Sequence, residues 1–282
     1  MVIHSLRPLS ATAGGVVPSP RTAAFTLNEL LVVLATLTVL ALLVFPVLAR
    51  SNDNDTRLVC LNNFRQMGLA LNMYAGDNRD YLAYPNWDDG SVGVAGWLYT
   101  VNSSGTIPDP INLAPWKSNP VTAWQTGAWF QYVQNPKSYL CPVDIENADY
   151  AKPANVGGRV EKLSTYVMNG AVTGFPTSGI GGPCKITDVW SPACYLLWEP
   201  DENSDGAGNP GHFEYNDGAN YPDSVEGIGR LHSPIGGHVL TIGGSVPMVT
   251  IPVWNAQAGA GTGPGPGGRT LTWWSPFAAN GN

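Results

Sequence analysis

The first feature of the chain is an apolar run near its N-terminus. No charge occurs in the nineteen residues from Leu30 to Leu48, whose only interruptions are Thr36, Thr38 and Pro46. At about 1.5 Å per helical residue, such a run is long enough to cross a bilayer core of roughly 30 Å. The pattern predicts a transmembrane helix over residues 25–49, with the carboxylate of Glu29 near its beginning.

An amphipathic pattern follows over residues 50–77. Apolar residues recur there at spacings of three and four, which marks one face of a helix. They are Leu58, Leu61, Phe64, Met67, Leu71 and Tyr74. Gly76 and Asn78 then supply a stop signal. Together the two patterns predict one helix over residues 25–77.

The remaining residues, 78–282, are rich in turn formers. The sequence has 33 Gly and 24 Pro, and 44% of its residues are hydrophobic. These values predict one domain with a sizeable core, short strands and long loops. The predicted fold class is α+β: a long N-terminal transmembrane helix leading into an antiparallel β-sheet head domain, with a flexible Gly/Pro-rich segment at residues 259–268.

The segment Ala24-Phe25-Thr26-Leu27-Asn28-Glu29 resembles the processing segment of prepilins and type II secretion pseudopilins. In that family a peptidase cuts before a Phe, methylates the new amine and leaves Glu as the fifth residue. The resemblance implies a leader at residues 1–24 and a cut between Ala24 and Phe25. It implies that Glu29 neutralises the N-terminal amine of a neighbouring subunit, and that Pro46 bends the helix. The family usually has Gly before the cut and an aliphatic residue before the Glu, where this chain has Ala24 and Asn28.

Further segments resemble landmarks of prepilin-like proteins that carry a C-terminal H-x9-DG segment. They are residues 60–71, 139–144, 164–170, 198–202 and 215–222. The C-terminal segment is degraded, because ten residues separate His232 from Gly243 and Gly243 replaces the expected Asp. The resemblance implies a structural subunit of a type IV pilus or type II secretion pseudopilus. Prepilin peptidase and other subunits would be its partners, and it would be a single-pass inner-membrane protein with its head in the periplasm or on a surface filament.

Two other interpretations of the N-terminus stay open. A secretory signal would use residues 1–29 as its n-region and a cleavage site at Val47-Leu48-Ala49, although the apolar run is longer than a usual h-region. A plain single-pass anchor is the other. Arginines flank the run on both sides, so charge does not decide orientation, and we expect the large C-terminal region to be exported.

Four cysteines in an exported domain favour disulfide bonds. Three pairings exist, of which we expect Cys60 with Cys141 and Cys184 with Cys194. A zinc site is not expected, because there is no CxxC spacing and the histidines are not arrayed with the cysteines. The histidines are His4, His212, His232 and His238.

An acidic loop at residues 201–206 has oxygen-bearing side chains at alternate positions and a turn glycine, as in calcium-binding loops. His212 stands where such a loop needs a bidentate Glu. The candidate ligands are Asp201, Asn203, Asp205, Glu214 and Asp217. The favoured interpretation is a solvated loop without metal, which leaves calcium as the one candidate cofactor.

Other function classes find little support. There is no GxSxG, HExxH or phosphate-binding glycine motif, so an enzyme is not expected. Without Arg7 and Arg21 of the leader, 12 basic residues face 21 acidic ones, so the net charge of −7 becomes −9 and disfavours nucleic-acid binding. The alternative function is a secreted or membrane-anchored module that binds carbohydrate or a partner through exposed tryptophans, since the chain has ten.

Overall fold

The structure is a computed structural model that describes residues 26–87, 93–147, 150–175, 182–200, 215–223, 226–259 and 268–282. For residues 43–54 it describes the backbone alone. The chain divides into two units, Met1–Arg50 and Ser51–Asn282, which we treat separately. The predicted leader, with Ala24 and Phe25 at the cut site, lies outside the described residues, as does most of the segment 259–268.

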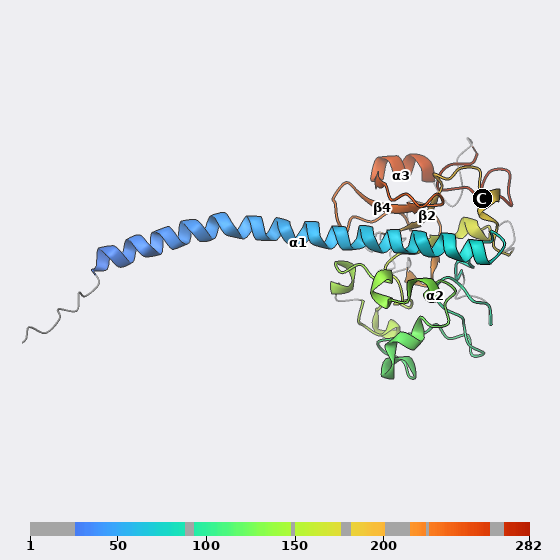
Figure 1. Ribbon diagram of the computed structural model, residues 1–282, viewed down its shortest axis with the longest axis horizontal. Coiled ribbons are helices and arrows are strands. Elements are labelled where there is room, and N and C mark those ends of the chain that lie inside the picture. The colour runs from blue at the N-terminus through green and yellow to red at the C-terminus, as the bar shows by residue number, and fades with distance from the viewer. Residues whose placement is uncertain are drawn as a thin grey trace, which may run out of the picture. The chain divides into compact units, whose positions relative to one another are not determined.

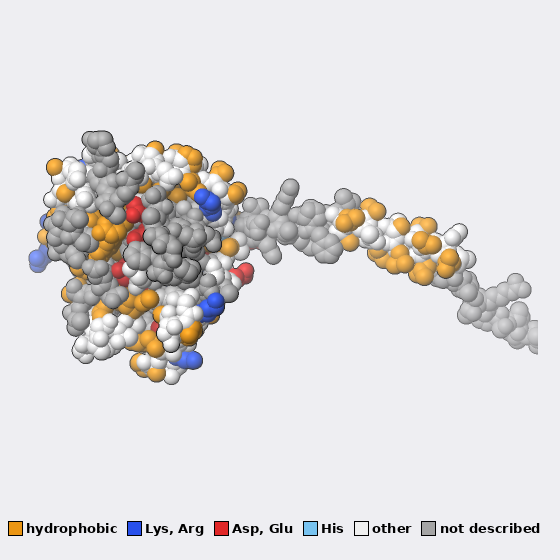
Figure 2. Space-filling view, turned by 180° about the vertical axis from the view of Figure 1, so that it is seen from behind, with side chains coloured by type: hydrophobic (Ala, Val, Ile, Leu, Met, Phe, Trp, Pro, Cys, Tyr) orange, Lys and Arg blue, Asp and Glu red, His pale blue; other side chains and the backbone are white. Residues whose placement is uncertain are grey.

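Helix α1 runs from Leu27 to Asp77 and supplies residues to both units (Figure 1). In the first unit its described side chains are almost all exposed, and Figure 2 shows apolar side chains along this part of the helix. Pro46 lies inside α1, and its side chain is outside the described part.

The prediction of a transmembrane helix over residues 25–49 was wrong. Across the described residues, no helix has a stretch both long enough and apolar enough to cross a membrane. The same finding overturns the predicted single-pass location in the inner membrane.

In the second unit, α1 packs against the head through a face that the periodicity largely predicts. Phe64, Met67 and Leu71 are fully buried, whereas Leu58 at the beginning of the predicted stripe is 61% exposed. Gly68 permits close packing on the sheet, because a Cβ at this position would lie only 3.1 Å from Leu240 Cδ1.

Five short strands form one sheet in the order β3-β1-β2-β4-β5. Their bounds are β1 Val167–Asn169, β2 Tyr195–Trp198, β3 Ala219–Asn220, β4 Gly236–Thr241 and β5 Met248–Thr250. Strands β1 and β3 pair in parallel, and the other neighbours pair antiparallel. The sheet is therefore mixed, which corrects the predicted antiparallel sheet. β3 reaches β1 by a long connection that includes β2, as parallel pairing requires, and not by a hairpin.

Both faces of this sheet are covered. Val239 belongs to a hydrophobic cluster with Trp254 of helix α3 (Ile251–Ala258), whereas the next residue, Leu240, belongs to a larger cluster with Phe64 of α1. Every residue of β1, β2, β3 and β4 is buried. The strands therefore lack the alternation of apolar and polar residues that marks a half-exposed sheet.

Short helical turns and irregular segments make up most of the remaining described chain. They comprise α2 Phe130–Val133 and the 3₁₀ turns η1 Trp116–Ser118, η2 Pro120–Ala123, η3 Pro136–Tyr139, η4 Asp144–Glu146, η5 Ala154–Val156, η6 Gly170–Val172 and η8 Ile186–Asp188. These connections bring sequence-distant residues together beside α1.

Candidate functional site

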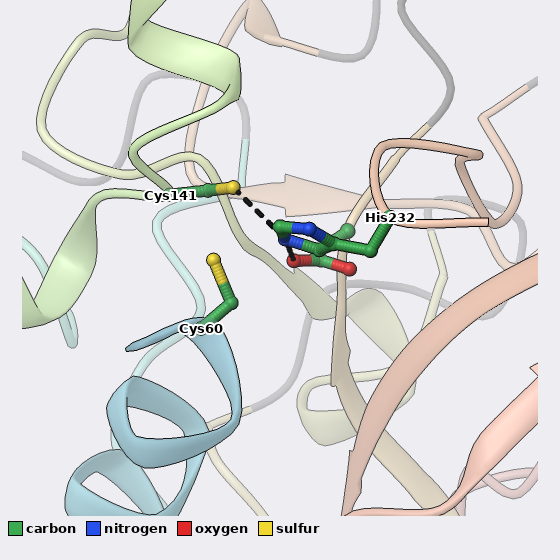
Figure 3. A group of neighbouring side chains, drawn as sticks. Cys60, Cys141 and His232 are labelled. Carbon is green, nitrogen blue, oxygen red and sulfur yellow. Dashed lines mark hydrogen bonds and ion pairs between the residues drawn. The ribbon is translucent and has the colours of Figure 1, made fainter. Parts of the chain in front are cut away.

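Four side chains from distant segments of the second unit meet in one buried cluster. They are Cys60, Cys141, Glu199 and His232, and one ligand-capable atom of each lies within 4.8 Å of all the others. Figure 3 shows the Cys141 sulfur facing the His232 ring and the Cys60 sulfur pointing toward that of Cys141. We call these four residues the Cys–His–Glu cluster.

Each member is held by a different element. Cys60 lies on the buried face of α1, one turn before Phe64. Cys141 follows the turn η3, and its N–H donates a hydrogen bond of 2.6 Å to Thr165 Oγ1. Glu199 directly follows β2, and its carbonyl accepts a hydrogen bond from the Gly229 N–H. His232 lies in the loop before β4.

The contacts within the cluster are short. His232 Nε2 lies 3.3 Å from Cys141 Sγ and 3.4 Å from Glu199 Oε1. The other carboxylate oxygen, Oε2, lies 3.8 Å from Nδ1 of His238 on β4. The Glu199 side chain is fully buried, and within the described residues neither of its oxygens accepts a hydrogen bond. A buried carboxylate is thus held between two imidazoles at ion-pair distance.

Burial and neighbouring charges shift the ionisation of the cluster. Burial raises the pKa of Glu199, but His232 and His238 outweigh it and hold the pKa below its usual value. Burial lowers the pKa of His232, but contacts with Cys141 and Glu199 outweigh it and raise the pKa to about 10. The hydrogen bond with Cys60 and burial together raise the pKa of the Cys141 thiol. Without a bound ion, Cys141 is therefore a thiol beside an imidazolium–carboxylate pair.

All four cysteines are buried free thiols in the structure, so it contains neither predicted disulfide bond. Burial raises the pKa of Cys184 and Cys194 to about 12. His232 contacts Cys141 across 91 positions of sequence, so the expectation that no histidine lies among the cysteines was wrong for His232.

A signal for the cluster was present in the sequence. Each member lies in one of the segments that carry the resemblance to prepilin-like proteins: residues 60–71, 139–144, 198–202 and the degraded C-terminal segment that begins at His232. From these segments the sequence predicted Cys60 and Cys141 as a disulfide pair, whereas Glu199 and His232 were not predicted as site residues.

Of the predicted calcium ligands, the structure describes Asp217 alone. Asp201, Asn203, Asp205 and Glu214 lie outside the described residues. Asp217 is described and buried, and its Oδ1 accepts a hydrogen bond of 2.8 Å from the Ala219 N–H. This contact gives Asp217 a local role in the turn before β3.

Glu29 forms a reciprocal capping box with Thr26 at the beginning of α1. Its Oε2 accepts hydrogen bonds from the Thr26 N–H at 2.9 Å and the Thr26 hydroxyl at 2.8 Å. The Glu29 N–H in turn donates to Thr26 Oγ1 at 3.3 Å. The hydrogen bonds from the Thr26 backbone and side chain lower the pKa of Glu29, so the exposed carboxylate is ionised at neutral pH.

The tryptophans are mostly part of the core. Eight of the ten are buried, Trp116 is half-buried and Trp190 is 49% exposed. A surface lined by several exposed tryptophans, which the binding-module interpretation needs, is therefore absent from the described residues.

A scan against models of protein families finds no match to this chain, and searches of curated proteins and of solved structures find none either.

Proposed function

We propose that the chain is a pilin-like structural subunit, which assembles with other subunits of a type IV pilus or type II secretion pseudopilus through packing of its N-terminal helix. The observation that supports this proposal is the exposed apolar surface of α1 in the first unit. Its exposed fractions run from 43% to 76% at Leu27, Leu30, Leu31, Val32, Val33, Leu34, Leu37, Val39, Leu40 and Leu42.

This surface surrounds the helix. Residues 30–34 are consecutive apolar residues, and five consecutive positions point in all directions around a helix with 3.6 residues per turn. A helix that is apolar on every side is stable when other elements cover it on every side. A bundle of such helices from several subunits provides that cover, whereas docking on a single groove covers one face.

Glu29 has a second role in this proposal. It carries the one charge among the residues from 25 to 49. Cleavage before Phe25 would create a cationic amine one residue before Thr26, whose N–H and hydroxyl contact the Glu29 carboxylate. Glu29 is therefore ionised and placed at the beginning of the helix, where it favours contact with the amine of a neighbouring subunit.

The first test is the intact mass and N-terminal sequence of the protein from its native source. A chain that begins at methylated Phe25 supports the proposal. A chain that begins near Ser51 indicates secretory cleavage and contradicts it, as does a chain that retains residues 1–24.

A second test separates the charge of Glu29 from its capping role. Gln also completes a capping box, so Glu29→Gln keeps the cap and removes the charge, whereas Glu29→Ala removes both. If a charge contact of about 1.5–3 kcal/mol drives assembly, both variants lower incorporation into sheared filaments by about 10- to 100-fold. Glu146→Gln, an exposed carboxylate in η4, serves as the control and assembles normally. If Glu29→Gln is incorporated into filaments as well as wild type, the charge of Glu29 has no role in assembly and the residue only caps its own helix.

A further inference from the structure

We propose that Cys60, Cys141, Glu199 and His232 bind one divalent transition-metal ion, with zinc as the best fit, at a closed site that fastens α1 to the head. The inference is independent of the assembly function proposed above, because all four residues lie within the second unit.

The spacing of the four donor atoms fits a tetrahedral ion. Zinc binds Cys sulfur at about 2.3 Å and His nitrogen or carboxylate oxygen at about 2.0–2.2 Å, which separates neighbouring donors by about 3.3–3.8 Å. The distances from His232 Nε2 to Cys141 Sγ and Glu199 Oε1 are 3.3 and 3.4 Å. All four donor atoms lie within 4.8 Å of one another, so a contraction of about 1 Å at the longest separation completes the site.

Glu199 supplies independent evidence for a cation. Its carboxylate is fully buried, and its oxygens have only the longer ion-pair contacts with His232 at 3.4 Å and His238 at 3.8 Å, neither of which has hydrogen-bond geometry. Buried polar groups nearly always have well-formed hydrogen bonds, and an exception calls for a closer partner such as an ion. An ion bound to Oε1 satisfies this carboxylate, while His238 at 3.8 Å from Oε2 is placed to orient it from outside the ligand shell.

A metal ion also accounts for the cluster better than a Cys60–Cys141 disulfide does. A disulfide engages the two sulfur atoms and leaves the buried Glu199 carboxylate with only its ion-pair contacts to His232 and His238, at 3.4 and 3.8 Å. A metal ion engages all four groups, and two thiolates with one imidazole are the donors that zinc prefers. Binding expels the two thiol protons and the proton on His232 Nε2 to solvent.

A surface pocket lies beside His232. This pocket of 460 Å³ is lined by His232 together with Thr56, Val143, Arg230, Leu231, Ser233 and Pro234. Because the protein supplies all four ligands and the donors are buried, no position is left for a substrate. The arrangement is that of a structural site and not of a catalytic one.

Metal content and thiol count test the proposal on the full chain. We expect one zinc per chain by elemental analysis of protein purified without chelator, and four titratable thiols after denaturation with EDTA. Adding zinc to the chelated protein at a hundredfold excess over Kd raises the Tm by about 5–10 °C. A mass lower by two thiol hydrogens, with no bound metal and with a peptide map that joins Cys60 to Cys141, would overturn the proposal.

Variants locate the site. Cys141→Ser and Glu199→Gln each reduce zinc content to well below one per chain, whereas the control Cys194→Ser, another buried free cysteine, retains the full amount. If the ligand variants fail to fold, Co²⁺ added to chelated wild-type protein reports the ligands instead. Tetrahedral visible bands with thiolate-to-cobalt absorption support the proposal, and the spectrum of octahedral aqueous Co²⁺ contradicts it.

Discussion

Arg159 and Asp144 form a bidentate ion pair in which both N–O distances are 2.6 Å and both side chains are fully buried. The guanidinium also lies over the Tyr215 ring, 3.8 Å from its centroid. The pair connects the turn η4, directly after the Cys141 segment, to the chain before β1. Removing this ion pair is therefore expected to disturb the packing of η4 and of the chain before β1, close to Cys141 of the Cys–His–Glu cluster.

Replacing Arg159 tests the cost of breaking this pair. Arg159→Met leaves the Asp144 carboxylate buried without its cation, which should lower the free energy of unfolding by about 3–5 kcal/mol. Asp144→Asn in the same chain should recover part of the loss, because it removes the uncompensated charge. Urea unfolding measures both, with exposed Arg65→Met on α1 as the control. A loss for Arg159→Met as small as that of the control would contradict the expectation.

The contacts of the Asp109 carboxylate predict that the free energy of unfolding falls in acid. Burial raises its pKa, but Lys162 at 2.9 Å and the N–H groups of Asn112 and Ile111 outweigh burial and hold the pKa below its usual value. Because the folded pKa is lower than the unfolded one, the contribution to stability is complete above about pH 4 and is lost as the pH falls through the folded value.

Asp109→Asn should therefore be less stable than wild type at pH 7, and the difference should shrink as the pH falls from about 5 to 2. Denaturant unfolding at a series of pH values measures this difference. The exposed carboxylate variant Glu146→Gln serves as the control. A difference between Asp109→Asn and wild type that stays constant with pH would rule out this linkage.

Adjacent asparagines on α1 give a matched pair for testing how the helix is fastened. Asn63 is buried and its Nδ2 donates to the Leu140 carbonyl at 3.0 Å and to the Tyr166 hydroxyl at 3.2 Å, whereas Asn62 is exposed. Asn63→Ala removes the donor to a part-buried carbonyl and to a buried tyrosine hydroxyl, and should cost about 1–3 kcal/mol in the free energy of unfolding. Asn62→Ala should stay within about 0.5 kcal/mol of wild type. Equal effects of the two variants would show that the hydrogen bonds of Asn63 contribute little to the free energy of unfolding.

Tryptophan fluorescence tests the burial of the aromatic side chains. With eight of ten tryptophans buried, acrylamide should quench only a minor part of the emission, chiefly that of Trp190 and Trp116. Trp190→Phe should remove most of the readily quenched part and leave unfolding unchanged. A large quenchable fraction in that variant would mean that further rings are accessible, and would restore the case for a tryptophan-lined binding surface.

The helix α1 could be predicted from the sequence because the apolar residues that mark its buried face lie within a few positions of one another. Spacings of three and four place Phe64, Met67 and Leu71 on one face, and these three residues are buried. The apolar content of residues 30–48 was read as a membrane span, which no helix of the described chain provides.

The strands could not be predicted from the sequence, because they lack an alternating pattern of apolar and polar residues. Strand β4 is buried at all six positions because α1 and α3 cover opposite faces of the sheet. A strand buried on both faces has no period of two for the sequence to display. The parallel pairing of β1 with β3 depends in turn on a long connection, which local turn signals do not reveal.

The sequence alone thus determined the helix and the segments that contain Cys60, Cys141, Glu199 and His232. Only the tertiary structure decided that these four residues meet. Hydrophobic periodicity acts between neighbours along the chain, whereas the meeting of Cys141 with His232, 91 positions apart, results from packing α1 and two loops against one sheet. The sequence supplied the four donors, and the fold brings them within 4.8 Å of one another.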